Sequence, residues 1–600
     1  MKLPAFRCFT AVAAAIFSLT AAQSASASQV SIEKQGNAWR LLREGKPYFV
    51  KGAGGDGSKQ LLRECGGNSF RTWGVDGLGK LLDEAQKYDM TVSAGIWLGH
   101  KEHGFDYHNA AAVAAQKESA RQAIEKHKAH AALLVWSIGN EMETAQADDP
   151  AVWEAVEAIA KLAKELDPNH PTMTVIAEIG GRNVENINKF CPSIDIIGIN
   201  TYGGGPSIAE RYLKAGGIKP YLITEYGPAG TWEVDKNAWG TVPELTSTEK
   251  AARYRETYEK TIANQPLSLG SYAFTWGNKQ EATSTWFGLL LPDGSKLGAV
   301  DALTELWSGH PPKNHAPEIK SLKLMGSDKV GPGATLRASL DLADAENNPL
   351  KVEWILQADP ATYATGGGAE SVPPVYPEAI VSSDSKSVEV KMPAFGGGYR
   401  LFAFVHDGQG GAAVGNIPLF VEGGGKMVVT APKATLPFAI YEEAEDSTKH
   451  YVPSGYMGNA AAIKLEAGCT DNPHAGTTCL KVDYTAADNW GGVVWQSPAN
   501  DWGDQPGGYD LTGAKKLTFW ARGAKGGEVV SFSLGLLGKD KKYPDSASNQ
   551  LEKVRLSDEW SQFSIQLKGQ DLSCIKTAFA WTIGSNGAPI TFYLDDIRYE

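Results

Sequence analysis

The sequence predicts a multidomain fold: a (β/α)8 TIM barrel followed by an immunoglobulin-like β-sandwich and a β jelly roll. Three observations support this prediction. Strand-like and helix-like segments alternate from about residue 30 to residue 310, which is typical of a parallel sheet built from βα units. Two stretches rich in Pro, Gly or His, residues 308–317 and 423–437, then interrupt the chain. The region after each stretch contains short segments with the period of two that strands show.

The first 27 residues have the pattern of an export signal. Lys2 and Arg7 precede an apolar run at residues 11–22, and residues 25–27 are the small-residue sequence Ala-Ser-Ala of a cleavage site. The apolar run is shorter than the roughly 20 residues that cross a membrane as a helix. We therefore expect a signal peptide at residues 1–27, a periplasmic or secreted protein, and no membrane span.

The first domain, residues 28–310, contains eight candidate strands. Each strand is a short apolar run bounded by turn-forming residues, and helical patterns separate the runs. Eight such units fit a closed barrel. An open doubly wound sheet is the alternative, but the Gly-rich stretch 52–57 resembles its phosphate loop only weakly. The expected strands are residues 47–54, 67–74, 91–99, 133–141, 172–179, 194–204, 220–227 and 268–277.

Two glutamates close the fourth and the seventh of these strands. Glu141 ends the run LLVWSIGNE, and Glu225 ends the apolar part of PYLITEYG. A buried carboxylate costs free energy unless it has a partner or a chemical role, although acidic residues also cap helices at such places. Because the active sites of these barrels lie at the carboxyl ends of the strands, the two glutamates are a candidate pair for acid–base and nucleophilic chemistry.

The neighbours of the two glutamates resemble those of a known group of enzymes. Asn140 directly precedes Glu141, and Tyr226 directly follows Glu225, as in the retaining β-glycosidases of clan GH-A. Residues 136–141, WSIGNE, resemble the barrel domain of glycoside hydrolase family 2 in particular. The resemblance implies that Glu225 is the nucleophile and Glu141 the acid/base of a double displacement that hydrolyses a β-linked glycan, of the β-glucan type.

Side chains at the other strand ends complete the site that the resemblance implies. Arg71 would keep the nucleophile charged, and Tyr202 would donate a hydrogen bond to it. Asn140 would hold the sugar 2-hydroxyl, and Trp276 would form an aromatic platform beneath the sugar. For Arg71 and Tyr202 the alternatives are a buried ion pair and a core tyrosine. The other candidates for lining the cleft are Trp73, Trp97, His100 and Asn200.

The way the chain enters the barrel bears on the substrate. An expected hairpin at residues 30–50 leads directly into the first barrel strand, which resembles family 5 enzymes more than complete family 2 enzymes. We therefore expect an open cleft for a polymeric β-glycan. Two alternatives stay open: a transglycosylase that uses the same two glutamates, and a non-catalytic glycan-binding protein. The sequence contains no HxH or HExxH pattern that would favour a metal-dependent hydrolase.

The two C-terminal domains are expected to be all β. Residues 315–422 resemble an immunoglobulin-like or PKD-like β-sandwich, for which we expect a spacer role. Residues 437–600 resemble a jelly-roll carbohydrate-binding module. Glu443 and Asp596, near its two ends, are candidates for a structural calcium site, with ordinary polar pairs as the alternative. Its candidates for a sugar platform are Trp490, Trp495, Trp502 and Trp581.

Composition and cysteine spacing limit the partners. A net charge of −12 argues against nucleic acid and favours a neutral ligand such as carbohydrate. We expect no cofactor for catalysis and a monomer. Cys469 and Cys479 bracket a turn-rich loop and could form a local disulfide in an oxidising compartment. Cys65, Cys191 and Cys574 lack metal-ligand spacing, and we expect buried thiols.

Overall fold

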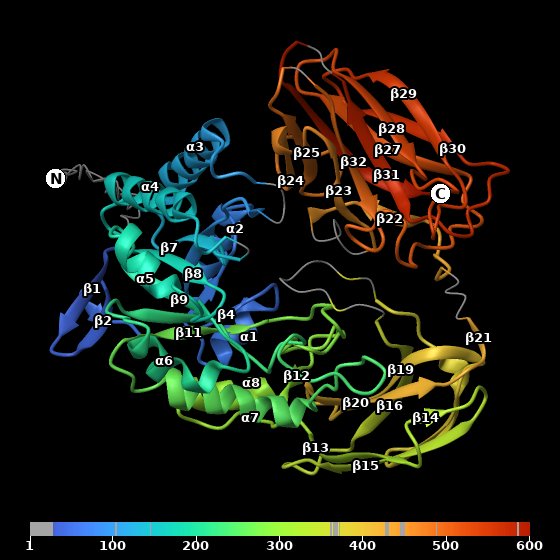
Figure 1. Ribbon diagram of the computed structural model, residues 1–600, viewed down its shortest axis with the longest axis horizontal. Helices are drawn as coiled ribbons and strands as arrows, with labels where there is room; N and C mark the ends of the chain where they lie inside the picture. The colour runs from blue at the N-terminus through green and yellow to red at the C-terminus, as the bar shows by residue number, and fades with distance from the viewer. Residues whose placement is uncertain are drawn as a thin grey trace, which may run out of the picture.

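The computed structural model describes residues 28–600 apart from 102–104, 145, 361–362, 364–369, 371, 427–430, 445–449, 488 and 585–586. The expected signal peptide lies outside the described residues. The described chain forms a closed parallel barrel, and four antiparallel or mixed sheets follow it (Figure 1). This arrangement confirms the multidomain fold class. None of the helices in these ranges is long and apolar enough to cross a membrane.

The barrel has eight parallel strands in the closed order β10-β11-β4-β5-β6-β7-β8-β9. Every residue of β6, β8, β9, β10 and β11 is buried. Strands covered on both faces are expected to be continuous apolar runs, and this is the pattern that identified them in the sequence. The strands are β4 (Val50–Gly54), β5 (Ser69–Arg71), β6 (Thr91–Ile96), β7 (Leu133–Asn140), β8 (Thr172–Ile176), β9 (Ile196–Asn200), β10 (Tyr221–Glu225) and β11 (Ser268–Phe274).

Local sequence signals start the helices that surround the barrel. Asp149 caps α4 through the Ala151 N–H, and Pro150 takes the first helical position, where no backbone donor is needed. Thr246 and Glu249 form a reciprocal capping box at the start of α7. The helices are α1 (Lys59–Glu64), α2 (Leu78–Lys87), α3 (Ala110–His127), α4 (Pro150–Leu166), α5 (Asn183–Phe190), α6 (Ile208–Lys214), α7 (Ser247–Thr257) and α8 (Gly298–Ser308).

A hairpin closes one end of the barrel. Strands β1 (Val30–Gln35) and β2 (Ala38–Arg43) pair antiparallel, and the short β3 (Lys46–Pro47) extends the sheet. Val30 and Leu41 pack in one cluster with apolar residues at or near the starts of the barrel strands. The hairpin therefore covers the amino-terminal end of the barrel, which leaves the carboxyl end, where Glu141 and Glu225 lie, as the open one.

The central β-sandwich consists of two sheets. One has the order β12-β20-β19-β16, and the other has the order β13-β15-β18-β17. The short β12, which belongs to the barrel part of the chain, pairs in parallel with β20 through Lys296 and Gly411, so the two domains share a sheet. The strands are β12 (Lys296–Leu297), β13 (Glu318–Met325), β14 (Lys329–Val330), β15 (Thr335–Ala343), β16 (Lys351–Ala358), β17 (Ile380–Ser383), β18 (Ser387–Lys391), β19 (Phe395–His406), β20 (Gly411–Val421) and β21 (Gly425–Lys426).

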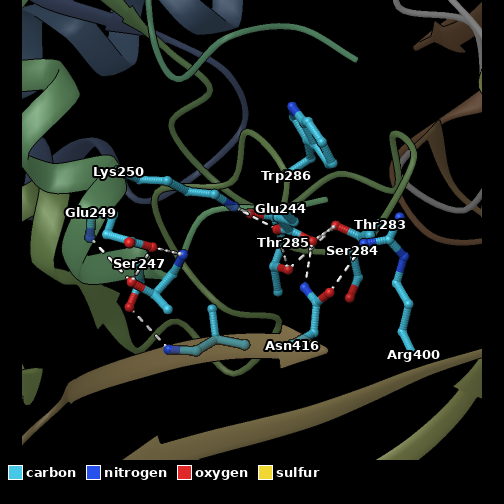
Figure 2. Close-up of polar contacts among 12 residues, drawn as sticks. Glu244, Ser247, Glu249, Lys250, Thr283, Ser284, Thr285, Trp286, Arg400 and Asn416 are labelled. Atoms are coloured by element: carbon cyan, nitrogen blue, oxygen red, sulfur yellow. Dashed lines mark hydrogen bonds and ion pairs between the residues drawn. The ribbon is translucent and has the colours of Figure 1, made fainter. Parts of the chain in front are cut away.

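A buried polar network joins the sandwich to the barrel (Figure 2). The carboxylate of Glu244, in the loop between β10 and α7, pairs with Lys250 and accepts hydrogen bonds from Thr283 Oγ1 at 2.8 Å and Thr285 Oγ1 at 2.9 Å. Asn416 on β20 donates to the same carboxylate at 2.7 Å. The Glu244 and Lys250 side chains are only 1% and 6% exposed.

One further sandwich residue extends this network. Arg400 on β19 donates to Asn416 Oδ1 at 3.0 Å and to the Val242 carbonyl at 2.7 Å. Because a buried charge is stable only when paired and hydrogen-bonded, the sandwich fixes the loops that follow β10 and β11 on the barrel. The sandwich is therefore attached to the barrel by buried polar contacts, and the spacer role expected from the sequence stays a prediction.

The last domain packs two sheets face to face, with the orders β24-β25-β32-β27-β30 and β23-β26-β31-β28-β29. The final strand β32 pairs with the early strand β22 through Phe438 and Tyr599, as the sequence predicts. The strands are β22 (Phe438–Tyr441), β23 (Val452–Gly458), β24 (Ile463–Cys469), β25 (Cys479–Tyr484), β26 (Gly491–Gln496), β27 (Lys516–Gly523), β28 (Val529–Leu534), β29 (Asn549–Arg555), β30 (Ser561–Gln566), β31 (Thr577–Ile583) and β32 (Ile590–Tyr599).

Several side chains predicted to act in this last domain have other environments. Cys469 and Cys479 are buried cross-strand partners with free thiols rather than a disulfide. Trp495 and Trp581 lie in the core, because both rings are fully buried, and so they cannot serve as a sugar platform. Trp490 and Trp502 are exposed.

Two shortened chains test how the domains depend on one another. A chain ending at residue 426 keeps the barrel and the sandwich, so we expect it to unfold in one cooperative transition. A chain ending at residue 310 leaves Glu244 and Lys250 without Asn416 and leaves β12 without its partner strand. We expect this chain to melt at least several degrees lower. Thermal melting followed by circular dichroism compares them, and equal melting temperatures would contradict the network's role.

Candidate active site

Both glutamates lie at the open end of the barrel. Glu225 is the last residue of β10 and is 6% exposed, and Glu141 directly follows β7. The Glu141 N–H donates to the Val175 carbonyl on β8 at 2.8 Å, which extends the sheet contact by one residue. Since all eight strands run in the same direction, the two carboxylates share one face of the molecule.

Three donors hold the carboxylate of Glu225. Arg71 Nη1 and Trp73 Nε1 each donate to its Oε1 atom at 2.9 Å, and the Tyr202 hydroxyl donates to Oε2 at 2.7 Å. The Arg71 side chain is 1% exposed. A buried guanidinium that faces a buried carboxylate forms a strong, directional pair. Both oxygens of Glu225 are therefore fixed in position.

Two asparagines connect the glutamates. Arg71 Nη2 donates to Asn140 Oδ1 at 2.6 Å, and Asn200 Nδ2 donates to that same oxygen at 3.2 Å. Asn200 Nδ2 also donates to Glu141 Oε1 at 2.6 Å. A continuous chain of hydrogen bonds thus runs from Glu225 through the guanidinium and the asparagines to Glu141. The structure brings five of the predicted site residues into contact around the two carboxylates: Arg71, Trp73, Asn140, Asn200 and Tyr202.

The two carboxylates differ in their electrostatic setting. Burial, and next the negative charge of Glu225, raise the pKa of Glu141 to about 7, while the hydrogen bond from Asn200 offsets part of that rise. Glu225 instead has a cation and two further donors on its oxygens. Two carboxylates with such different surroundings suit a proton donor and an ionised nucleophile.

The aromatic residue beneath the site is Phe274, not Trp276. Phe274 ends β11, and its ring lies edge-on to Trp73 at 6.0 Å and to Tyr202 at 6.1 Å between centroids. Trp276 is fully buried, and its Nε1 donates to the Ser58 carbonyl. The prediction was wrong because β11 ends at Phe274, three residues before the end of the predicted strand at residue 277, so Trp276 lies beyond the strand.

Two further charged residues lie close to the site. Glu281, in the loop after β11, is 4% exposed and pairs with Lys279 at 3.1 Å. Burial is the main reason that the pKa of Glu281 is raised, and the charge of Glu225 adds to it. Sequence reasoning gave Glu281 no role, because the loop after β11 carries no periodic pattern that would place it.

The remaining predicted residues lie beside the network or far from it. Trp97 directly follows β6 and stacks on His100, with 4.9 Å between ring centroids. In the last domain, Glu443 accepts hydrogen bonds from Thr477 and Thr478, while Asp596 pairs with His474. Within the described ranges no group of three or more His, Cys, Asp or Glu side chains could hold a metal ion. The two carboxylates proposed for calcium have protein partners instead.

Comparison with known proteins gives partial matches to glycosidases. Residues 76–249, a segment that contains both glutamates, match the family model described as the TIM barrel domain of glycosyl hydrolases family 2. A curated relative, the beta-glucuronidase of Streptococcus agalactiae serotype V, is 23% identical over 231 residues, which are 31% of this chain and 38% of that protein.

Two solved structures illustrate the structural likeness. A beta-glucuronidase from an uncultured Clostridium species is 19% identical, with a TM-score of 0.38 over 47% of this chain and 54% of its own. A family 5 mannosidase from Rhizomucor miehei is 15% identical, with a TM-score of 0.34 over 46% of this chain and 97% of its own. This chain spans little more than half of that Clostridium protein and less than half of the curated relative. The chain therefore contains a closed (β/α)8 barrel, and residues 76–249 of it are similar to the TIM barrel domain of glycosyl hydrolases family 2.

Proposed function

We propose that this chain is a retaining β-glycoside hydrolase in which Glu225 is the nucleophile and Glu141 the acid/base. One observation carries the proposal: a single hydrogen-bonded network holds one carboxylate with three donors and leaves the other with a pKa of about 7. Acid and nucleophile of such enzymes are two carboxyl groups whose surroundings separate their protonation states. The substrate is a β-linked glycan. No cofactor takes part.

The reaction would proceed in two displacements. Glu225 attacks the anomeric carbon, and the bond from that carbon to the leaving oxygen breaks as Glu141 gives its proton to this oxygen. In the second step the Glu141 carboxylate takes a proton from water, and the resulting oxygen attacks the anomeric carbon and releases Glu225. Arg71 and Tyr202 would keep the Glu225 carboxylate oriented throughout, because each donates a hydrogen bond to a different oxygen of it.

Transglycosylation is the second candidate function. It differs only in the acceptor, since a sugar hydroxyl would replace water after the covalent intermediate has formed. Product analysis with a panel of β-glucans, mannans, xylans, galactans and β-glucuronides distinguishes the two. The panel includes β-glucuronides because the curated relative is named a beta-glucuronidase.

We further propose export of the chain and glycan binding by the last domain, supported by its exposed Trp490 and Trp502.

The first prediction concerns the nucleophile. Glu225→Ala should lower turnover by about a thousandfold or more, because no covalent intermediate can form. Azide should restore turnover and give an α-linked glycosyl azide, which chromatography and NMR identify. Glu178→Ala is the matched control, since Glu178 also follows a barrel strand but pairs with Arg211 outside the network. Full activity in a pure Glu225→Ala preparation would remove the assignment.

The second prediction concerns the proton donor. Glu141→Gln should slow the cleavage of natural glycans strongly and spare aryl glycosides with good leaving groups, whose departing oxygen needs little protonation. Steady-state kinetics over a series of phenols of falling pKa measure this difference. Equal losses for both kinds of substrate would show that Glu141 does not protonate the leaving group.

The third prediction concerns pH. The general acid works when protonated, so kcat on an unactivated glycan should fall as pH rises above about 7, the pKa of Glu141. Asn200 stabilises the charged form of Glu141 and lowers this pKa. Asn200→Ala should therefore move the alkaline limb to higher pH. A limb that stays in place, or one that moves to lower pH, would contradict the proposed contact between Asn200 and Glu141.

A further inference from the structure

Two tryptophans at the open end of the barrel expose about half of their side chains. Trp97 is 47% exposed and Trp232 is 50% exposed. Trp97 directly follows β6, and Trp232 lies in the loop after β10. In the closed order of eight strands, β6 and β10 are four strands apart in either direction. The two loops therefore rise from opposite sides of the ring whose end carries the two glutamates.

The ring of Trp232 is held in place next to the site. It lies edge-on to Tyr202, with 5.6 Å between centroids, and the Tyr202 hydroxyl binds Glu225. The Glu233 carboxylate accepts hydrogen bonds from the Gly203 and Gly230 N–H groups, both at 2.8 Å, and so ties this turn to the loop after β9. A Cβ atom on Gly230 would lie 2.4 Å from the Trp232 ring. The Trp232 ring therefore packs directly against the backbone of Gly230.

The ring of Trp97 is held as well. It stacks on His100 with an angle of 23° between the planes. The loop that carries it is fixed at Gly99, whose N–H donates to Gln116 at 2.7 Å and whose carbonyl accepts from Tyr107 at 2.8 Å. Side chains ordered before a ligand arrives lose little entropy on binding. Both tryptophan rings are therefore held in a fixed orientation before a ligand binds.

We propose that Trp97 and Trp232 are the stacking platforms of two sugar subsites on opposite sides of the cleavage point, an inference that rests on the proposed function. The apolar C–H face of a pyranose matches the face of an indole ring, and neither ring offers a charge. One sugar at the carboxylates and one on each platform make three. The substrate is therefore a β-linked chain of at least three sugars, and not a small glycoside.

Binding to an inactive full-length variant tests this proposal independently of turnover. Calorimetry on Glu225→Ala should show affinity for β-1,3- or β-1,4-linked gluco-, manno- or xylo-oligosaccharides that rises from two sugars to at least three. Adding Trp97→Ala or Trp232→Ala should each lower the affinity for the longest chain by about tenfold, roughly one aromatic contact. Trp232→Phe should recover part of the loss. Affinity for the disaccharide should change less.

The outcomes separate this proposal from the function on which it rests. If the platforms bind as described but the parent enzyme cleaves none of these chains, the subsites stand and the hydrolase assignment fails. If the parent cleaves them while neither alanine variant changes affinity, the platforms are wrong and the hydrolase assignment stands. If Trp490→Ala lowers the affinity while Trp97→Ala and Trp232→Ala do not, the oligosaccharide binds to the last domain and the proposal is overturned. The absence of any binding would overturn it as well.

Discussion

A single buried cation determines how the open end of the barrel is arranged. Arg71 is 2% exposed, and its guanidinium needs acceptors because an unpaired buried charge costs several kcal/mol. It finds them in Glu225, in Asn140 and in the carbonyl of Thr224. Asn140 Oδ1, which accepts from Arg71, also accepts a hydrogen bond from Asn200, and Asn200 in turn donates to Glu141. Replacing any member of this set leaves a neighbour without its partner, so the residues form one unit and not five separate contributions.

A second buried ion pair extends that order to the loops above the barrel. Glu244 and Lys250 hold the segment after β10 against Thr283 and Thr285, and the sandwich residue Asn416 completes the set. The loop of Thr283 also carries Glu281, whose charge acts on the site. The sandwich therefore contacts the loops after β10 and β11, although it contributes no residue to the hydrogen-bonded network around the two carboxylates.

Sequence reasoning found the barrel and most of its network because both depend on local patterns. Apolar runs mark buried strands, and a polar residue at the end of a run marks the catalytic end, which is how Arg71, Asn200 and Tyr202 were identified. Sequence reasoning failed where the position of a side chain depends on the exact end of a strand or on a partner far away in the sequence. Trp276 was placed in the site by a three-residue error at the end of β11. Asn416 lies 172 positions from Glu244, and no periodicity connects residues so far apart.

The pairing of β12 with β20 has a consequence for how this protein can be rearranged over evolution. A genetic exchange that joined the barrel to a different partner just after α8 would remove both the strand beside β12 and the amide that Glu244 needs. The barrel and the sandwich therefore depend on each other structurally, despite the Pro-rich stretch at residues 308–317 that looks like a junction. The last domain takes part in neither of these two contacts, so its replacement would leave the β12–β20 pairing and the Glu244 network intact.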